Sequence, residues 1–171
     1  MDEIELVIPN KKLEIGALEY KKEHFHNGED EMHGSALFDK TNSYDDWLIQ
    51  LKNNSDETTV NSKWVVSTTF FAVRKCDGKI DIRHTLNEFL KEYGGNIGYG
   101  VRPSERKKGY ATEILKMALE YCKKLDLKKV MLACYKENEA SSKTITKCGC
   151  ILEKEFMYTD KKIVQTFWIA L

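Results

Sequence analysis

The stretch from Arg106 to Ala111 has the composition of a loop that binds an anion through its main chain. It joins an expected strand, Ile97 to Val101, to an expected amphipathic helix over about 109–125. The start of a helix presents main-chain N–H groups that have no acceptor within the helix, and the positive end of the helix dipole lies behind them. A glycine in the loop lets a ligand approach the backbone closely, and three basic side chains add charge. This arrangement suits a pyrophosphate, and its candidate residues are Arg106, Lys107, Lys108, Gly109, Tyr110 and Ala111.

A basic surface turn in front of a helix would have the same composition, and on this segment alone the two interpretations are about even. The segment lacks the Lys-Ser/Thr ending of a Walker loop and the three glycines of a dinucleotide-binding fingerprint. The elements around the loop must therefore decide between them.

The second half of the chain predicts a regular alternation of strands and helices. Residues 64–74 are rich in β-branched and aromatic types, and residues 76–79 contain an Asp-Gly turn signal, so a hairpin is expected there. The apolar run 130–135 predicts a central strand, and Asn138 can cap a helix that stops at Gly149. The remaining expected elements are strands over about 4–8, 80–84, 151–158 and 163–170, helices over 11–25 and about 43–52, and a short helix or turn over 86–93. This order indicates an α/β fold with a mixed sheet.

Several segments together resemble the GNAT superfamily of N-acetyltransferases. Residues 106–111 are similar to its acetyl-CoA-binding motif Arg/Gln-x-x-Gly-x-Gly/Ala, and residues 97–103 are similar to its fourth strand and the exit from that strand. Asn138, with the residues that follow it to Gly149, is similar to its second cofactor-contacting segment. The resemblance is specific from about residue 64 to the C-terminus, and residues 82–99 are similar to a poorly characterised subgroup of small predicted acetyltransferases.

The resemblance implies where acetyl-CoA would bind. Main-chain N–H groups of residues 106–111 would hold the pyrophosphate, and the strand at Tyr99 to Val101 would pair with the pantetheine arm. In this family strands four and five splay apart and leave a slot for the arm. The side chain of Asn138 would contact the arm, with Ser141 close by; an ordinary helix cap is the alternative role of Asn138, and both can hold at once.

The groups that would move protons are harder to assign. A free alkyl amine has a pKa near 10, so a base must take its proton or the site must lower its pKa. Many family members carry a tyrosine acid where this chain has Ile145, and Tyr135 is either a substitute or a packing residue. His84 is our candidate base, although it could simply brace the turn after its strand. Glu88 and Glu92 are the alternatives, although solvated helix carboxylates are the commoner explanation for them.

Composition limits the other partners. Twenty-seven basic and 27 acidic residues give a formal net charge of zero, so no overall field favours nucleic acid or an anionic membrane. We expect a cytoplasmic protein, because no apolar run approaches the roughly 20 residues of a membrane span and the N-terminus is not of signal-peptide type. The five cysteines form no CxxC pair, and we expect no metal. Related folds often dimerise, which leaves a homodimer open.

The sequence therefore predicts one GNAT domain over residues 1–171, with a cofactor-binding core at about 64–150 and a C-terminal hairpin at about 151–170. The predicted enzyme transfers the acetyl group of acetyl-CoA to a primary amine of a small molecule or peptide, by direct attack in a ternary complex. A non-catalytic acetyl-CoA-binding or regulatory domain of the same fold is the alternative. A third interpretation, a polymer-binding module, predicts salt-sensitive binding at residues 106–108.

Overall fold

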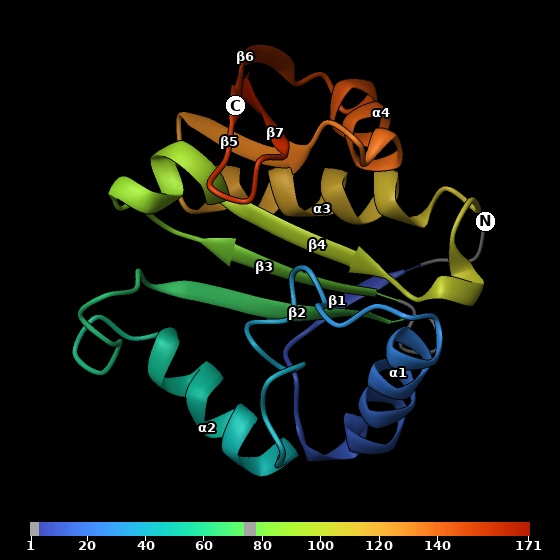
Figure 1. Ribbon diagram of the computed structural model, residues 1–171. Coiled ribbons are helices and arrows are strands. Elements are labelled where there is room, and N and C mark those ends of the chain that lie inside the picture. Colours follow the sequence, from blue (N-terminus) through green and yellow to red (C-terminus); the bar gives the residue numbers. More distant parts are fainter. Residues whose placement is uncertain (1–3, 74–77) are drawn as a thin grey trace.

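The computed structural model describes residues 4–73 and 78–171, and its strands form two antiparallel sheets (Figure 1). The first sheet has the order β1 (Glu5–Val7), β2 (Ser67–Val73), β3 (Gly78–Arg83) and β4 (Ile97–Val101). The second has the order β5 (Lys129–Tyr135), β7 (Ile163–Ala170) and β6 (Ile151–Met157). The predicted α/β class is confirmed, but in the described residues the expected single mixed sheet is two sheets with antiparallel pairings.

Helices cover both faces of the first sheet. The helix α3 (Tyr110–Lys124) lies on one face, and α1 (Glu14–His26) and α2 (Tyr44–Asn54) lie on the other (Figure 1). A fourth helix, α4 (Glu139–Lys147), packs beside β5 and α3. The short helices are η1 (Lys11–Leu13), η2 (Leu90–Gly94) and η3 (Pro103–Glu105).

Local sequence signals explain where these helices begin and end. The Ser43 hydroxyl accepts a hydrogen bond from the N–H of Asp46 and starts α2, as expected for a helix cap. Asn138 caps α4 in the same way, and Gly149 follows that helix with a φ of 93°. The predicted turn at 76–79 lies partly outside the described residues, and Gly78 already begins β3.

Two cores hold the layers together. One lies between α3 and the two sheets and includes Ile80, Ile114, Leu132 and Phe167. The other lies under α1 and α2 and is aromatic: Trp47 packs on Phe38 and Phe71. The first sheet is thus fixed from both faces, which gives the residues at its β4 edge a rigid support.

The two sheets meet at the start of β4 and then part. Gly95 forms an isolated bridge with Leu132, and the side chain of Asn96 accepts from the N–H of Met131 at 2.9 Å. Gly95 has a φ of 65°, and a Cβ there would lie 2.5 Å from the carbonyl oxygen of Met131, so only glycine fits. Beyond this point no pairing between β4 and β5 occurs in the described residues.

Candidate active site

The loop between β4 and α3 presents free main-chain donors. Lys107 has a φ of 62° and Gly109 a φ of 91°, so the backbone turns sharply twice before the helix. Within the described part of the chain, no hydrogen bond uses the N–H groups of Lys107, Lys108, Gly109 or Ala111. A turn of this kind, at the N-terminus of a 15-residue helix, can accept an anion.

Arg106 braces the loop from below. Its guanidinium forms a two-pronged ion pair with Glu29, with N–O distances of 2.5 and 2.7 Å, and its Nε donates to the carbonyl oxygen of Val101 at 3.2 Å. We expected Arg106 to add positive charge to the anion cradle, but Glu29 largely compensates that charge. The arginine instead fixes the loop to the segment after α1.

A second ion pair ties the same loop to α1. Glu23 accepts from Arg102 at 3.1 Å and from the main-chain N–H of Ser104 at 2.7 Å. Neither Glu23 nor Glu29 was identified from the sequence, because each lies more than 70 residues from its partner. No sequence pattern within one segment indicates which arginine pairs with which glutamate at such separations.

Of the two carboxylates that hold this loop, Glu29 has the more strongly lowered pKa. Its hydrogen bond with Arg106 lowers the pKa of Glu29 to about 2. The same carboxylate contacts the Nδ1 of His24 at 2.7 Å, and burial lowers the pKa of that histidine although Glu29 opposes the shift. The brace is therefore charged at neutral pH through Glu29 and Arg106.

One edge of β4 is open beyond Asn96. The N–H of Arg83 donates to the carbonyl oxygen of Asn96 at 2.7 Å, and hydrogen-bonding residues alternate along an antiparallel ladder. By this alternation the main-chain groups of Tyr99 and Val101 point away from β3, toward β5. The carbonyl oxygen of Val101 accepts from Arg106, which agrees with that direction. An extended ligand can thus pair with β4 at Tyr99.

The Tyr99 side chain reaches α4 across this gap. Its phenol oxygen lies 2.9 Å from the hydroxyl oxygen of Ser141, and burial raises the pKa of Tyr99 to about 12. Ser141 is held in turn, because its N–H donates to the side-chain oxygen of Asn138 at 3.1 Å. Three candidate residues from two distant segments are therefore brought together at one place.

The residues considered as acids and bases lie apart. Ile145 is fully buried in the core, so the side chain at the family tyrosine position does not face a ligand. The Nε2 of His84 lies 2.9 Å from the hydroxyl oxygen of Thr68, and burial lowers the pKa of His84. Within the described residues, no contact joins His84 to the 106–111 loop or to α4. Its catalytic role stays a prediction.

The other candidates sit near the surface. Glu88 pairs with Lys91 at 3.0 Å on a solvated turn. Burial raises the pKa of Tyr135 to about 12, and the ammonium of Lys162 lies 5.4 Å from its ring centre. Glu92 hydrogen-bonds with Tyr93. None of these contacts places a side chain at the open edge of β4.

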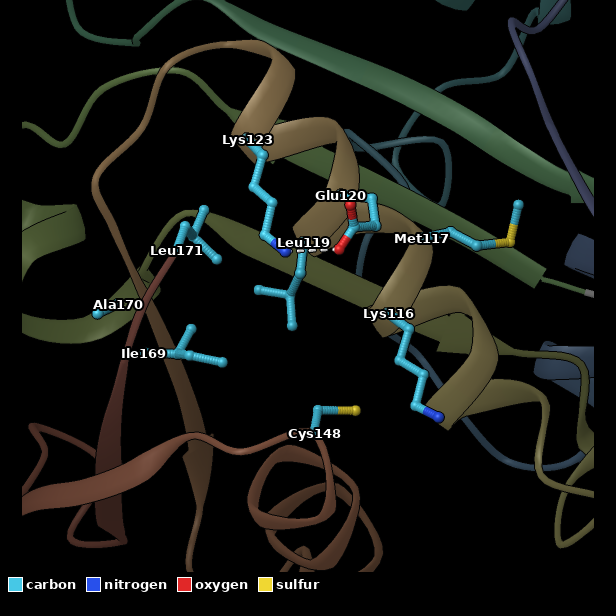
Figure 2. Close-up of a pocket in the computed structure, with 9 residues that line it drawn as sticks. All are labelled: Lys116, Met117, Leu119, Glu120, Lys123, Cys148, Ile169, Ala170 and Leu171. Carbon is cyan, nitrogen blue, oxygen red and sulfur yellow. Dashed lines mark hydrogen bonds and ion pairs between the residues drawn. The ribbon is translucent and has the colours of Figure 1, made fainter.

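A shallow groove on the other side of α3 is separate from this site. It has a volume of about 460 Å³ and lies between α3 and the end of β7 (Figure 2). Its floor is apolar, with Leu119, Ile169 and Leu171, and Lys116 and Lys123 stand at its rim. It contains neither the loop donors nor Tyr99.

Within residues 4–73 and 78–171, no group of three or more His, Cys, Asp or Glu side chains is arranged to hold a metal ion. No helix in the same residues has the length and apolar character needed to cross a bilayer.

The sequence matches a known family model over most of its length. Residues 20–151 match the model described as an acetyltransferase (GNAT) domain. No curated protein sequence matches the chain significantly.

Solved structures of low sequence identity share the fold. A ribosomal-protein-S5-alanine acetyltransferase from Vibrio fischeri superposes with a TM-score of 0.75 at 16% identity, covering 99% of this chain and 94% of the other. A ribosomal L7/L12 α-N-protein acetyltransferase in complex with coenzyme A gives 0.71 at 13%, covering 100% and 96%. A microcin C7 self-immunity acetyltransferase in complex with acetyl-CoA and AMP gives 0.68 at 18%, covering 100% and 94%.

Proposed function

Because the chain belongs to the GNAT acetyltransferases, we propose that it transfers the acetyl group of acetyl-CoA to a primary amine of a small molecule or peptide by direct attack in a ternary complex. The observation that carries the proposal is the set of free N–H donors of Lys107, Lys108, Gly109 and Ala111, beside a β4 edge that pairs with no strand beyond Asn96 in the described residues. The first feature suits a pyrophosphate, and the second suits an extended arm that carries amides.

The residues present fit acetyl-CoA in three respects. Lys107, Lys108, Gly109 and Ala111 offer main-chain donors. The side chains of the two lysines add positive charge: Lys108 pairs with Glu105 at 3.0 Å, and Lys107 forms no salt bridge within residues 4–73 and 78–171. Tyr99 offers an N–H and a carbonyl to the arm by the alternation of β4. Asn138 and Ser141 form the opposite wall at the start of α4. We propose these residues as the cofactor contacts, with Tyr110 in the same loop.

When bound, acetyl-CoA supplies an activated acyl group, and the chain supplies its position. In this proposal the main-chain N–H groups of Tyr99 and Val101, which face away from β3, stabilise the developing oxyanion, and the ladder to β3 holds the strand so that little reorganisation is needed. Holding the amine beside the thioester converts a bimolecular reaction into a local one. Several solved structures of this fold are named as acetyltransferases of proteins or of spermidine, and this range supports an amine acceptor in general.

Two measurements test this function. Isothermal titration calorimetry should show binding of acetyl-CoA to the folded chain, and a thiol-release assay with a panel of amines and peptide N-termini should show turnover. Reversal of the brace with Arg106→Glu places two carboxylates together at residues 29 and 106, and should weaken acetyl-CoA binding. Absence of any binding heat with wild type, together with no effect of Gly109→Val on any ligand, would overturn the proposal.

We further propose that the chain is one domain over residues 1–171 and acts in the cytoplasm, with His84 as the candidate base. A homodimer stays open. Analytical ultracentrifugation measures the oligomeric state, and the pH profile of turnover in His84→Gln tests the base. Because burial lowers the pKa of His84, we predict that the turnover rate of wild type reaches its plateau at a lower pH than it would with an unperturbed histidine as the base.

A further inference from the structure

The phenol of Tyr99 lies between β4 and α4, 2.9 Å from the hydroxyl oxygen of Ser141, on the side where the two sheets have parted. The sheets last touch at Gly95 and Leu132, and Tyr99 lies four residues beyond the first of these. Cys134, two residues beyond Leu132 on β5, is close enough to contribute to the raised pKa of Tyr99. The phenol therefore lies within the open part of the gap and is bounded by β4, β5 and α4.

On the basis of the proposed function, we propose that the Tyr99 phenol donates a hydrogen bond to the coenzyme A sulfur as the thioester breaks, and that Ser141 positions the phenol. The chain would thus carry its leaving-group donor on β4, at a different place from the helix position that Ile145 occupies.

The chemistry balances without another reactant. The amine nitrogen bonds to the carbonyl carbon, the carbon–sulfur bond breaks, and its electron pair goes to sulfur. The proton lost by the amine goes to the proposed base and from there to solvent, and the phenol keeps its own proton. Its raised pKa of about 12 is consistent with this role, because the group stays a donor across the range in which a thiol ionises.

Ser141 is suited to positioning because it is fixed from two sides. Its hydroxyl oxygen lies 2.9 Å from the phenol, and its N–H is held by Asn138 at 3.1 Å. A hydroxyl can accept from the phenol when no ligand is present and release it when the sulfur arrives. Cys134 is a weaker candidate donor, because a thiol donates poorly and burial raises its pKa.

The test compares coenzyme A, which has an ionisable thiol, with acetyl-CoA, which has none. Calorimetry gives the Kd of each at about pH 7 and about pH 9.5, on either side of a thiol pKa near 8.5. In the ratio of the two Kd values, the effects of all groups that titrate in both complexes drop out. A hydrogen bond to a charged acceptor should favour the thiolate, so with wild type the ratio should move toward coenzyme A by about 10-fold or more as the pH rises.

Tyr99→Phe keeps the ring and removes the donor. This variant should still bind acetyl-CoA through the main-chain groups of residue 99, and its Kd ratio should vary with pH by less than about threefold, since the hydrogen bond is missing. Tyr121→Phe is the matched control, because its phenol lies on α3 and bonds to Thr68 of β2 at 3.5 Å. Tyr121→Phe should keep the pH dependence of wild type. Thermal melts at both pH values establish that each variant is folded.

The outcomes separate this inference from the proposed function. Binding of neither ligand to wild type would overturn both. Binding of both ligands with a ratio that is independent of pH would overturn the Tyr99 role and leave acetyl-CoA binding intact. Retention of the pH dependence in Tyr99→Phe, or its loss in Tyr121→Phe, would also overturn the Tyr99 role.

Discussion

Glu29 connects the 106–111 loop to the segment after α1 although it is 77 residues from Arg106. Both carboxylate oxygens are engaged by the guanidinium, and one also contacts His24. Two-pronged Arg–carboxylate pairs are directional as well as charged, so this pair sets the orientation of the loop. The Glu29–Arg106 ion pair is therefore the main support of the 106–111 loop, and Glu29 itself lies outside that loop.

Glu29→Gln should reduce stability in a pH-dependent way. The folded-state pKa of Glu29, about 2, lies below its ordinary value of 4.5, so its contribution to stability is present above pH 4.5 and is lost as the pH falls toward 2. The Arg106 side chain is 41% exposed, so solvent screens the ion pair. We therefore expect the free energy of unfolding to fall by about 1–2 kcal/mol at pH 7. Urea unfolding at several pH values measures it; a difference between wild type and variant that stayed constant down to pH 3 would contradict the assignment.

Gly109→Ala should weaken acetyl-CoA binding beyond its effect on folding. Its φ of 91° strains any side chain, which costs about 1–3 kcal/mol, and the added methyl also stands where a phosphate would approach. Gly149→Ala is the matched control, since Gly149 has a φ of 93° and its added Cβ would meet only Ile169, at 3.5 Å. Calorimetry should show weaker binding in Gly109→Ala alone, after urea titrations confirm similar losses of stability. Equal affinities in the two variants would count against the loop as a binding site.

At the scale of elements, patterns confined to one segment were predictable and pairings between segments were not. The 3.6-residue apolar period gave α3 within one residue at each end, and the cap signals gave Ser43 and Asn138. The splay of β4 from β5 came from the family resemblance and is present. The sequence does not indicate that Gly95 and Asn96 join the sheets, because that contact depends on Met131 in a distant strand.

The loop between α1 and α2 is an element whose packing no local pattern predicted. Gly34 lies directly on β4: a Cβ there would be 2.5 Å from the carbonyl oxygen of Gly98, and its φ is 69°. Gly34→Ala should therefore lower stability by about 2–4 kcal/mol, from backbone strain plus overpacking. Gly28→Ala, with a φ of 77° and nothing within 4 Å, isolates the strain and should lose about 1–2 kcal/mol. Equal losses of unfolding free energy in the two variants, measured by urea unfolding, would show that the loop can move away from β4 to make room for the added methyl.

At the scale of the whole molecule, two sheets are joined by a narrow contact and separated by a gap that we assign to acetyl-CoA. Asn96 is central to that contact: its N–H donates to the carbonyl oxygen of Met131 at 2.7 Å, and its side-chain oxygen accepts from the N–H of Met131. The side-chain amide of Asn96 also donates to the main-chain carbonyl oxygen of Arg83 at 3.2 Å. The Asn96 amide is thus the direct link between the two sheets at this point, and the core under α3 packs against both of them.

Asn96→Ala should loosen the junction and make the protein depend more on its ligand. The N–H of Met131 would be left buried without its acceptor, at a cost of about 1–3 kcal/mol. Asn87→Ala is the control, since its side chain caps a turn at the surface and its loss should cost about 1 kcal/mol or less. Acetyl-CoA at 100 times its Kd should restore about 2.7 kcal/mol if it binds only the folded state. Urea unfolding with and without acetyl-CoA measures both effects. A variant as stable as wild type without ligand would show that the sheets are held together elsewhere.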